Sequence, residues 1–261
     1  MRSPFFIAFA TYLFSFLCFY FFADLLAFQP HPTSYRDDDR FVKIATPDGV
    51  RLTALYLPNA QARYTLLFSH GNAEDLGDNL EFLQGLQKAN FAVLAWDYRG
   101  YGASEGTPSE ETLYSDQQAV YGYLLRELKT PPERIIVLGR SLGSVAAVDL
   151  AARQPVAGLI LEGGLISGQR VLFPVPLFPF DRFRNLEKMG RVRCPVLVIH
   201  GTADNVIPFR HGEALFRAAH EPKRNWWVQN AGHNDLAYQA GPEYGRKLQE
   251  FAAWVDEQKK P

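Results

Sequence analysis

The sequence predicts an α/β domain with a mostly parallel central sheet and helices on both faces. Three observations lead to this expectation. Short, uninterrupted apolar runs recur along the chain, as in strands buried on both faces of a sheet. Segments of helical character separate these runs. Two alternating segments precede them and end in turn residues. With no internal repeat and no second core, residues 41–258 are expected to form one domain.

The expected elements begin with an antiparallel hairpin at the edge of the sheet, because Pro47-Asp48-Gly49 is a turn between two alternating segments. Buried apolar strands then alternate with helices, and Thr107-Pro108-Ser109-Glu110 opens one helix with a capping box and a proline in its first turn. The expected strands are residues 41–46, 51–57, 64–68, 91–96, 135–138, 158–162, 196–199 and 226–228. The expected helices are residues 75–88, 107–128, 144–151, 210–219 and 243–257.

The N-terminal region is expected to hold the domain at a membrane. No charge occurs between Phe5 and Ala23, and about 20 apolar residues in a helix span a hydrocarbon core. A cleaved secretory signal that starts at Arg2 is the alternative, although Leu25-Leu26-Ala27 is a poor cleavage site. The side of the membrane stays open, because basic residues flank the apolar run at both ends. The expected order is a tail at residues 1–4, a spanning signal anchor at 5–28 and a linker at 29–40.

The chain of 261 residues has a net charge of -1, which gives no indication of a nucleic-acid partner. No metal-ligand cluster and no phosphate loop stands out in the sequence, so we expect no cofactor. Nothing in the sequence fixes an oligomeric state.

The pentapeptide Gly139-Arg140-Ser141-Leu142-Gly143 carries the strongest chemical signal. An apolar strand precedes it and a helix rich in small residues follows it. In a G-x-S-x-G turn between strand and helix, the serine hydroxyl is lifted above the end of the sheet. Side chains in place of the glycines would collide with the neighbouring strand or helix. Ser141 is therefore the expected nucleophile.

A serine hydroxyl needs a positioned base, and His233 directly follows the last expected strand. Asp204 follows the strand at residues 196–199 and is the expected acid that orients this base. Glu162, one strand earlier, is the rival acid, whereas Asp235 is too near His233 in sequence to be a good orienter. The other histidines are assigned to the linker (His31), a backbone turn (His70), internal packing (His200) and a surface helix (His211 and His220).

Two backbone N–H groups are expected to form the oxyanion hole. The N–H of Leu142 lies next to the nucleophile at a helix start. The second comes from the loop after the first parallel strand, where we choose Asn72, with Gly71 allowing close approach of the backbone.

An insertion at residues 163–190 interrupts the alternation of strands and helices, and its prolines exclude a long helix. Its apolar residues suggest a substrate pocket or lid, for which Leu172, Phe173, Leu177 and Phe178 are the candidates. A loop packed on the domain and a surface that touches the bilayer are the alternatives.

Several stretches of residues 40–255 resemble the α/β-hydrolase-domain-containing protein 17 and 13 families. The resemblance implies the α/β-hydrolase fold, with Ser141, Asp204 and His233 as the triad. It also implies serine hydrolase activity, which in the 17 branch removes palmitoyl groups from protein cysteines. That branch has a cysteine-rich, S-acylated N-terminus, whereas this chain has an apolar segment with one cysteine. The matching stretches are residues 67–77, 97–104, 139–143, 197–204 and 231–235.

The expected function is a membrane-anchored serine hydrolase that cleaves carboxylic esters or thioesters through an acyl-enzyme intermediate. Its expected partners are a small-molecule or acyl-protein substrate and the lipid bilayer. A serine peptidase of the same fold and a non-catalytic binding protein are the alternatives, and labelling of Ser141 by a fluorophosphonate separates an enzyme from a binder.

Overall fold

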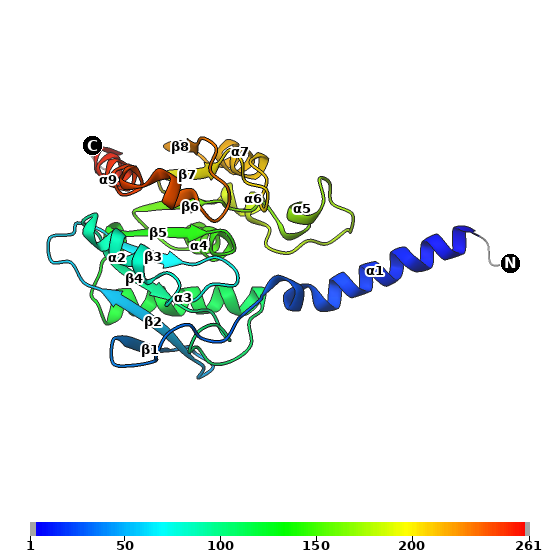
Figure 1. The fold of residues 1–261 in the computed structure, drawn as a ribbon, viewed down its shortest axis with the longest axis horizontal. Helices are drawn as coiled ribbons and strands as arrows, with labels where there is room; N and C mark the ends of the chain where they lie inside the picture. Colours follow the sequence, from blue (N-terminus) through cyan, green and yellow to red (C-terminus); the bar gives the residue numbers. More distant parts are fainter. Residues whose placement is uncertain (1–3, 259–261) are drawn as a thin grey trace.

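The computed structural model describes residues 4–258, apart from the side chains of residues 4, 18, 19, 22 and 26. An eight-stranded sheet forms its centre, in the order β1-β2-β4-β3-β5-β6-β7-β8 (Figure 1). The strands are β1 Phe41–Ala45, β2 Arg51–Leu57, β3 Thr65–Ser69, β4 Ala92–Trp96, β5 Ile135–Arg140, β6 Gly158–Glu162, β7 Val196–Gly201 and β8 Lys223–Val228. The helices are α1 Pro4–Ala27, α2 Leu80–Lys88, α3 Glu110–Arg126, η1 Pro132–Arg134, α4 Gly143–Arg153, α5 Gly168–Leu172, α6 Asn185–Met189, α7 Arg210–Ala218, α8 Leu236–Ala240 and α9 Pro242–Gln258.

Only the first strands of the sheet are antiparallel. β2 pairs antiparallel with both β1 and β4, and every later pair is parallel. Within the parallel part, Ser69 of β3 lies opposite Trp96 of β4 and Gly139 of β5. The carboxyl ends of these strands therefore meet at one edge, which is where open α/β sheets bind ligands.

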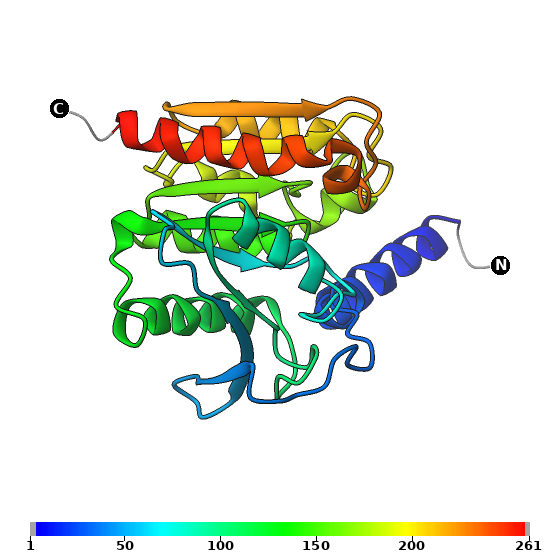
Figure 2. The ribbon, with the colours of Figure 1, turned by 60° about the vertical axis from the view of Figure 1, so that its left-hand side comes forward.

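Helices cover both faces of the sheet (Figure 2). Residues of α3, α4, α6 and α7 form one apolar core with one side of the strands. Residues of α2, α8 and α9 form a second core with the other side. Strands β3 to β6 are buried along nearly their whole length, as their continuous apolar sequences predict. The predicted α/β class and its mostly parallel sheet are confirmed.

Two predicted helix starts are corrected by side-chain hydrogen bonds. The carboxylate of Asp75 accepts from the N–H groups of Gly77 and Asp78, which holds this stretch as a turn, so α2 begins at Leu80 rather than at residue 75. Helix α3 is capped by Ser109 through a capping box with Thr112. The proline of the predicted capping segment therefore precedes the cap and does not lie in the first turn.

The N-terminal segment is a single helix, α1, that projects from the domain (Figure 1). Among the residues that the structure describes, no helix combines the length and the apolar character needed to cross a bilayer. The expected spanning helix is therefore not supported. Several side chains of α1 are nevertheless both apolar and exposed, among them Phe5, Phe9, Phe14 and Phe21.

The insertion at residues 163–190 contains the short helices α5 and α6 and lies beside α1. The rings of Phe178 and Phe180 contact Phe16 of α1, with centroids 6.0 and 5.2 Å away. The hydroxyl of Tyr12 donates to the carbonyl of Leu177 at 3.2 Å. The apolar end of the insertion thus packs against the N-terminal helix.

Candidate active site

Ser141 lies in the turn between β5 and α4, in a left-handed backbone conformation with φ of 51°. Such a conformation is strained for a residue with a side chain. Its N–H donates to the carbonyl of Glu162 at 2.8 Å, which fixes the turn to β6. A Cβ on Gly139 would lie 2.5 Å from the carbonyl oxygen of Gly143, and a Cβ on Gly143 would lie 2.0 Å from that of Ser69. Both glycines are therefore required by sterics, as the pattern predicts.

The three residues chosen from the sequence for a triad form one hydrogen-bonded chain. Nε2 of His233 lies 2.8 Å from Oγ of Ser141, and Nδ1 of His233 lies 2.7 Å from Oδ2 of Asp204. Because an ionised carboxylate only accepts hydrogen bonds, Nδ1 carries the proton and Nε2 is free to accept the serine proton. The arrangement can activate a serine hydroxyl, and the catalytic roles themselves remain predictions.

Asp204 is held ionised and in a fixed orientation. Its Oδ1 accepts from the N–H groups of Val206 and Ile207, at 2.9 and 2.8 Å. Burial by itself raises the pKa of this carboxyl, but its contacts with His200 and His233 and the Ile207 N–H outweigh burial and hold the pKa well below its usual value. The other oxygen is left to face the imidazole.

The rival acids are bound elsewhere. Glu162 accepts from Nε of Arg140 at 2.8 Å and from the hydroxyl of Tyr244. Asp235 accepts from the N–H of Gly232 at 2.7 Å. Neither carboxylate contacts the His233 ring in the described structure, so geometry favours Asp204 over both alternatives.

The two residues chosen for an oxyanion hole line the same cavity as the serine. Asn72, Ser141 and Leu142 all line this cavity. Within the described part of the chain, the N–H groups of Asn72 and Leu142 donate to no other group. Both are therefore available to bind a developing negative charge.

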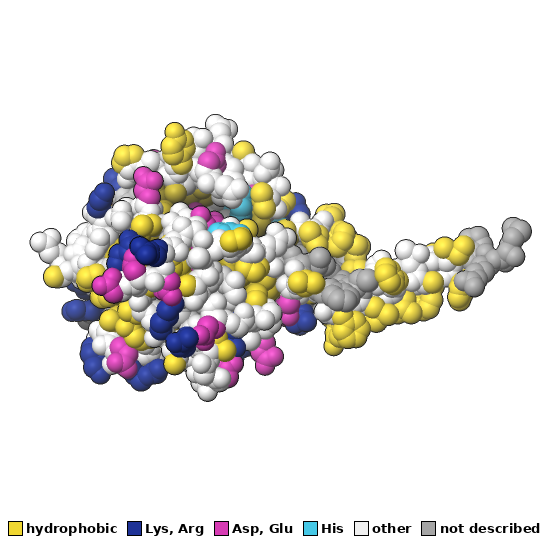
Figure 3. All heavy atoms as spheres, turned by 60° about the horizontal axis from the view of Figure 1, so that its bottom comes forward, with side chains coloured by type: hydrophobic (Ala, Val, Ile, Leu, Met, Phe, Trp, Pro, Cys, Tyr) yellow, Lys and Arg dark blue, Asp and Glu magenta, His cyan; other side chains and the backbone are white. Residues whose placement is uncertain are grey.

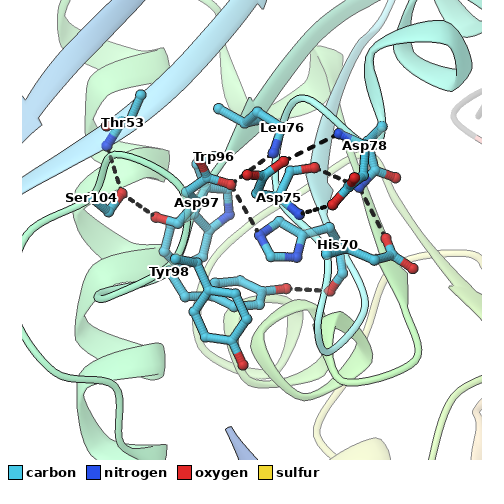
Figure 4. Close-up of polar contacts among 12 residues, drawn as sticks. Thr53, His70, Asp75, Leu76, Asp78, Trp96, Asp97, Tyr98 and Ser104 are labelled. Atoms are coloured by element: carbon cyan, nitrogen blue, oxygen red, sulfur yellow. Dashed lines mark hydrogen bonds and ion pairs between the residues drawn. The ribbon is translucent and has the colours of Figure 1, made fainter. Parts of the chain in front are cut away.

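The loop that carries Asn72 is held by a buried polar cluster (Figure 4). Oδ1 of Asp97 accepts from the N–H of Leu76 at 2.9 Å and lies 3.3 Å from Nε2 of His70. The hydroxyl of Tyr98 donates to the carbonyl of His70 at 2.5 Å. Burial alone would lower the pKa of His70, but Asp97, together with Glu74 and the carbonyl of Gly71, outweighs burial and raises the pKa. His70 is thus more than part of a backbone turn, because it links the loop to the residue after β4.

His200 is buried inside the domain, as predicted, whereas the prediction for His211 is wrong. His200 also contacts Asp204, since its Nε2 lies 3.3 Å from Oδ2 of Asp204 and 2.9 Å from the carbonyl of Ile207. Its Nδ1 has no hydrogen-bond partner among the described residues, so the ring is only half satisfied. His211 is fully buried rather than on a surface, because it accepts from the N–H of Ile166 and bonds the carbonyl of Arg170.

The cavity at Ser141 measures about 300 Å³ and is mainly apolar. Of the four candidates for a pocket or lid, Leu172 lines it. Phe178 lines a neighbouring cavity of about 410 Å³, and Phe173 and Leu177 line neither of the two. The insertion contributes further wall residues beside these four candidates. They are Leu165, Gly168, Val171, Arg182 and Phe183.

Residues outside the insertion also line the cavity. Val206 and Ile207 lie two and three positions after Asp204, and this position in the sequence could have indicated them. Ala23, Ala27 and Gln29 come from the end of α1 and the residues after it, for which the sequence holds no signal.

One group of potential metal ligands was missed by sequence reasoning. Ligand atoms of His31, Asp75 and Asp78 lie within 4.8 Å of one another. The carboxylate of Asp75 already accepts from the N–H of Ser34 and from the turn at residues 77–78, and His31 bonds Asp78 at 2.9 Å. Their mutual hydrogen bonds account for the closeness of these three side chains. The same bonds join the linker to the turn that precedes α2.

The comparisons with known proteins find hydrolases. Residues 60–186 match a hydrolase family model described as serine aminopeptidase, S33. Human alpha/beta hydrolase domain-containing protein 17B is 43% identical over 219 residues, which are 82% of this chain and 74% of that protein. Mouse protein 17C is 45% identical over 193 residues, or 73% of this chain and 60% of that protein.

Solved structures share the fold at low sequence identity. An esterase from Pyrococcus furiosus is 19% identical, with a TM-score of 0.71 over 86% of this chain and 97% of that one. The esterase domain of a Rhodothermus marinus protein is 22% identical, with a TM-score of 0.63 over 80% of this chain and 97% of that one.

Proposed function

This chain belongs to the α/β-hydrolase-domain-containing protein 17 family, and from this premise we propose that it is a serine hydrolase that cleaves carboxylic esters or thioesters. The observation that carries the proposal is the chain of two hydrogen bonds from Ser141 through His233 to Asp204. The apolar cavity beside Ser141 supports an acyl substrate.

In the proposed reaction, His233 removes the proton of Ser141 as the hydroxyl attacks the carbonyl carbon. Asp204 keeps the proton on Nδ1 and stabilises the imidazolium that forms. The N–H groups of Leu142 and Asn72 bind the oxyanion of the tetrahedral intermediate. His233 then gives its proton to the leaving alcohol or thiol, and water releases the acyl group from Ser141 by the same steps.

The proposal extends to a substrate at a membrane surface. The exposed aromatic side chains of α1 support association with lipid. We therefore propose membrane attachment through the N-terminal segment and S-acylated protein cysteines as one substrate class, beside small acyl esters. Flotation of the full chain with liposomes, compared with a variant that begins at residue 29, tests the attachment. Recovery of both proteins in the unbound fraction would refute it.

A fluorophosphonate probe and a series of p-nitrophenyl esters test the enzymatic proposal. The wild-type chain should be labelled at Ser141 and should hydrolyse esters, and Ser141→Ala should lose both properties while keeping its thermal unfolding temperature. Turnover retained in Ser141→Ala, or a wild-type chain that is neither labelled nor active, would refute the proposal.

The name of the matching family model makes aminopeptidase activity a second candidate. An aminopeptidase must bind the ammonium group of its substrate, for which a carboxylate is the usual partner. Among the described residues that line the cavity, the charged one is Arg182, a cation. The geometry therefore favours an uncharged acyl group, and aminoacyl p-nitroanilides provide the test, since hydrolysis of them would favour the peptidase.

A further inference from the structure

The cavity beside Ser141 is a composite of segments that lie far apart in sequence. The nucleophile turn and the oxyanion loop form its polar end, through Ser141, Leu142 and Asn72. The insertion forms a second side. The last turn of α1 and the residues after it form a third side, through Ala23, Ala27 and Gln29. The N-terminal segment is thus a wall of the candidate active site, although most of α1 projects away from the domain (Figure 3).

The side chain of Asn72 fixes this wall to the oxyanion loop. Its Nδ2 donates to the carbonyl of Ala27 at 2.7 Å, and its Oδ1 accepts from the N–H of Gln29 at 3.0 Å. The hydroxyl of Tyr101 lies 2.8 Å from the same N–H and donates to Asn72 at 2.6 Å. One amide side chain therefore makes two backbone hydrogen bonds with residues that flank Phe28, as a neighbouring strand would.

Two further contacts hold the end of α1 and the residues after it against the domain. Phe28 is buried and packs edge-on against Phe183 of the insertion, with ring centroids 5.8 Å apart. Asp24 accepts through Oδ1 from the N–H of Glu110 at the start of α3, at 3.2 Å. The wall is thereby attached to the insertion, to α3 and to the oxyanion loop.

The side chains that this wall presents to the cavity are small. Ala23 and Ala27 lie one helical turn apart, so they share one face of α1. Apolar residues of the insertion and of the loop after Asp204 line the same cavity. An acyl chain attached to a carbonyl at Ser141 fits this environment, because the lining beyond the polar end of the cavity is mainly apolar, with Gln29 and Arg182 as its polar members.

We propose that Ala23, Ala27 and Gln29 form the wall that limits the chain length in the acyl pocket, and that the two alanines leave the space into which a long acyl chain extends. The occupant is the acyl group of the substrate. This inference rests on the proposed hydrolase function and adds to it a binding site that includes the N-terminal segment.

Substitution of the small residues by a large one tests the proposal. The full chain carrying Ala23→Phe or Ala27→Phe is compared with wild type on p-nitrophenyl esters from acetyl to palmitoyl. Displacing three or four methylene groups from the pocket should lower kcat/KM for the palmitoyl ester, relative to the acetyl ester, by about a hundredfold. Ala10→Phe is the matched control, because Ala10 is exposed on α1 and does not line the cavity, and it should keep the wild-type ratio.

The outcomes separate the two proposals. Labelling of Ser141 by a fluorophosphonate checks that each variant is folded and competent. Labelled variants that keep the wild-type ratio of long to short esters would overturn the wall while leaving the hydrolase intact. A wild-type chain that is neither labelled nor active would instead overturn the hydrolase. If both phenylalanine variants fail to fold, Ala23→Val and Ala27→Val give a smaller shift in the same direction, and no shift in them refutes the wall.

Discussion

Replacing Asp204 by asparagine should move the ring proton of His233 from Nδ1 to Nε2. The reason is that the surrounding backbone dictates how the new amide is oriented. The N–H groups of Val206 and Ile207 donate to Oδ1 and require an oxygen there. In Asp204→Asn the amide oxygen must occupy this position. The amide nitrogen then takes the place of Oδ2 and faces Nδ1 of His233.

An amide nitrogen is a donor, so Nδ1 of His233 would have to accept and the ring proton would move to Nε2. The base could then no longer accept the proton of Ser141. Loss of the correct tautomer with otherwise intact geometry lowers kcat about 10⁴-fold in serine proteases, which equals about 5 kcal/mol of activation free energy. We expect a loss of the same order here.

The measurement is kcat for p-nitrophenyl ester hydrolysis, with thermal unfolding as the check on the fold. Asp235→Asn is the matched control, since Asp235 binds the N–H of Gly232 in the same loop without contacting the His233 ring, and it should stay within about threefold of wild type. An Asp204→Asn variant that keeps kcat within tenfold of wild type would refute the reasoning.

Other substitutions test the fold around the site. Gly143→Ala should destabilise the chain by about 3 kcal/mol or more, because the new Cβ would lie 2.0 Å from the backbone oxygen of Ser69. Gly85→Ala, where the Cβ meets nothing within 4 Å, should be neutral or stabilise α2 by up to about 1 kcal/mol in the same unfolding assay. Arg140→Gln should lower the free energy of unfolding by about 3–5 kcal/mol, because it leaves the carboxylate of Glu162 buried without its cation. An unfolding temperature equal to that of wild type would contradict this. Burial lowers the pKa of His211 to about 4, so the unfolded chain binds more protons between about pH 4 and 6.5, and stability should fall by about 2 kcal/mol from pH 7 to 5. Denaturant titrations should show that His211→Gln removes most of this decline, and an equal decline in both proteins would exclude the assignment.

Much of the sheet and the centre of the candidate site could be predicted because their signals are local. The apolar run from Ile135 to Leu138 and the two glycines around Ser141 define strand, turn and helix within ten residues. The order of serine, acid and base along the chain fits Asp204 and His233, although Glu162 has the same place in this order and is set aside only by its contacts in the structure.

The walls of the cavity depend on contacts that short patterns do not encode. The hydrogen bond from Asn72 to the carbonyl of Ala27 joins residues 45 positions apart. The apolar sequence around Ala27 predicts only that this segment is removed from water, and it does not predict what the segment contacts. The burial of His211, in contrast, could have been predicted from the sequence. The apolar residue Leu215 lies four positions later on the same helical face, and the two residues are buried together.

Strand β8 lies at the edge of the sheet. This position affects how the loss of activity on heating relates to unfolding of the whole sheet. Ser141 follows a central strand that is buried along most of its length, whereas His233 follows an edge strand with two exposed residues and one buried residue. Edge elements open locally at a lower free energy than a buried centre does. Heat inactivation should therefore follow fraying of β8 and its loop, at temperatures where spectroscopy still records an intact sheet. Stabilising the last strand and helix α9 would then extend the working range of the enzyme more than any change in the already buried core.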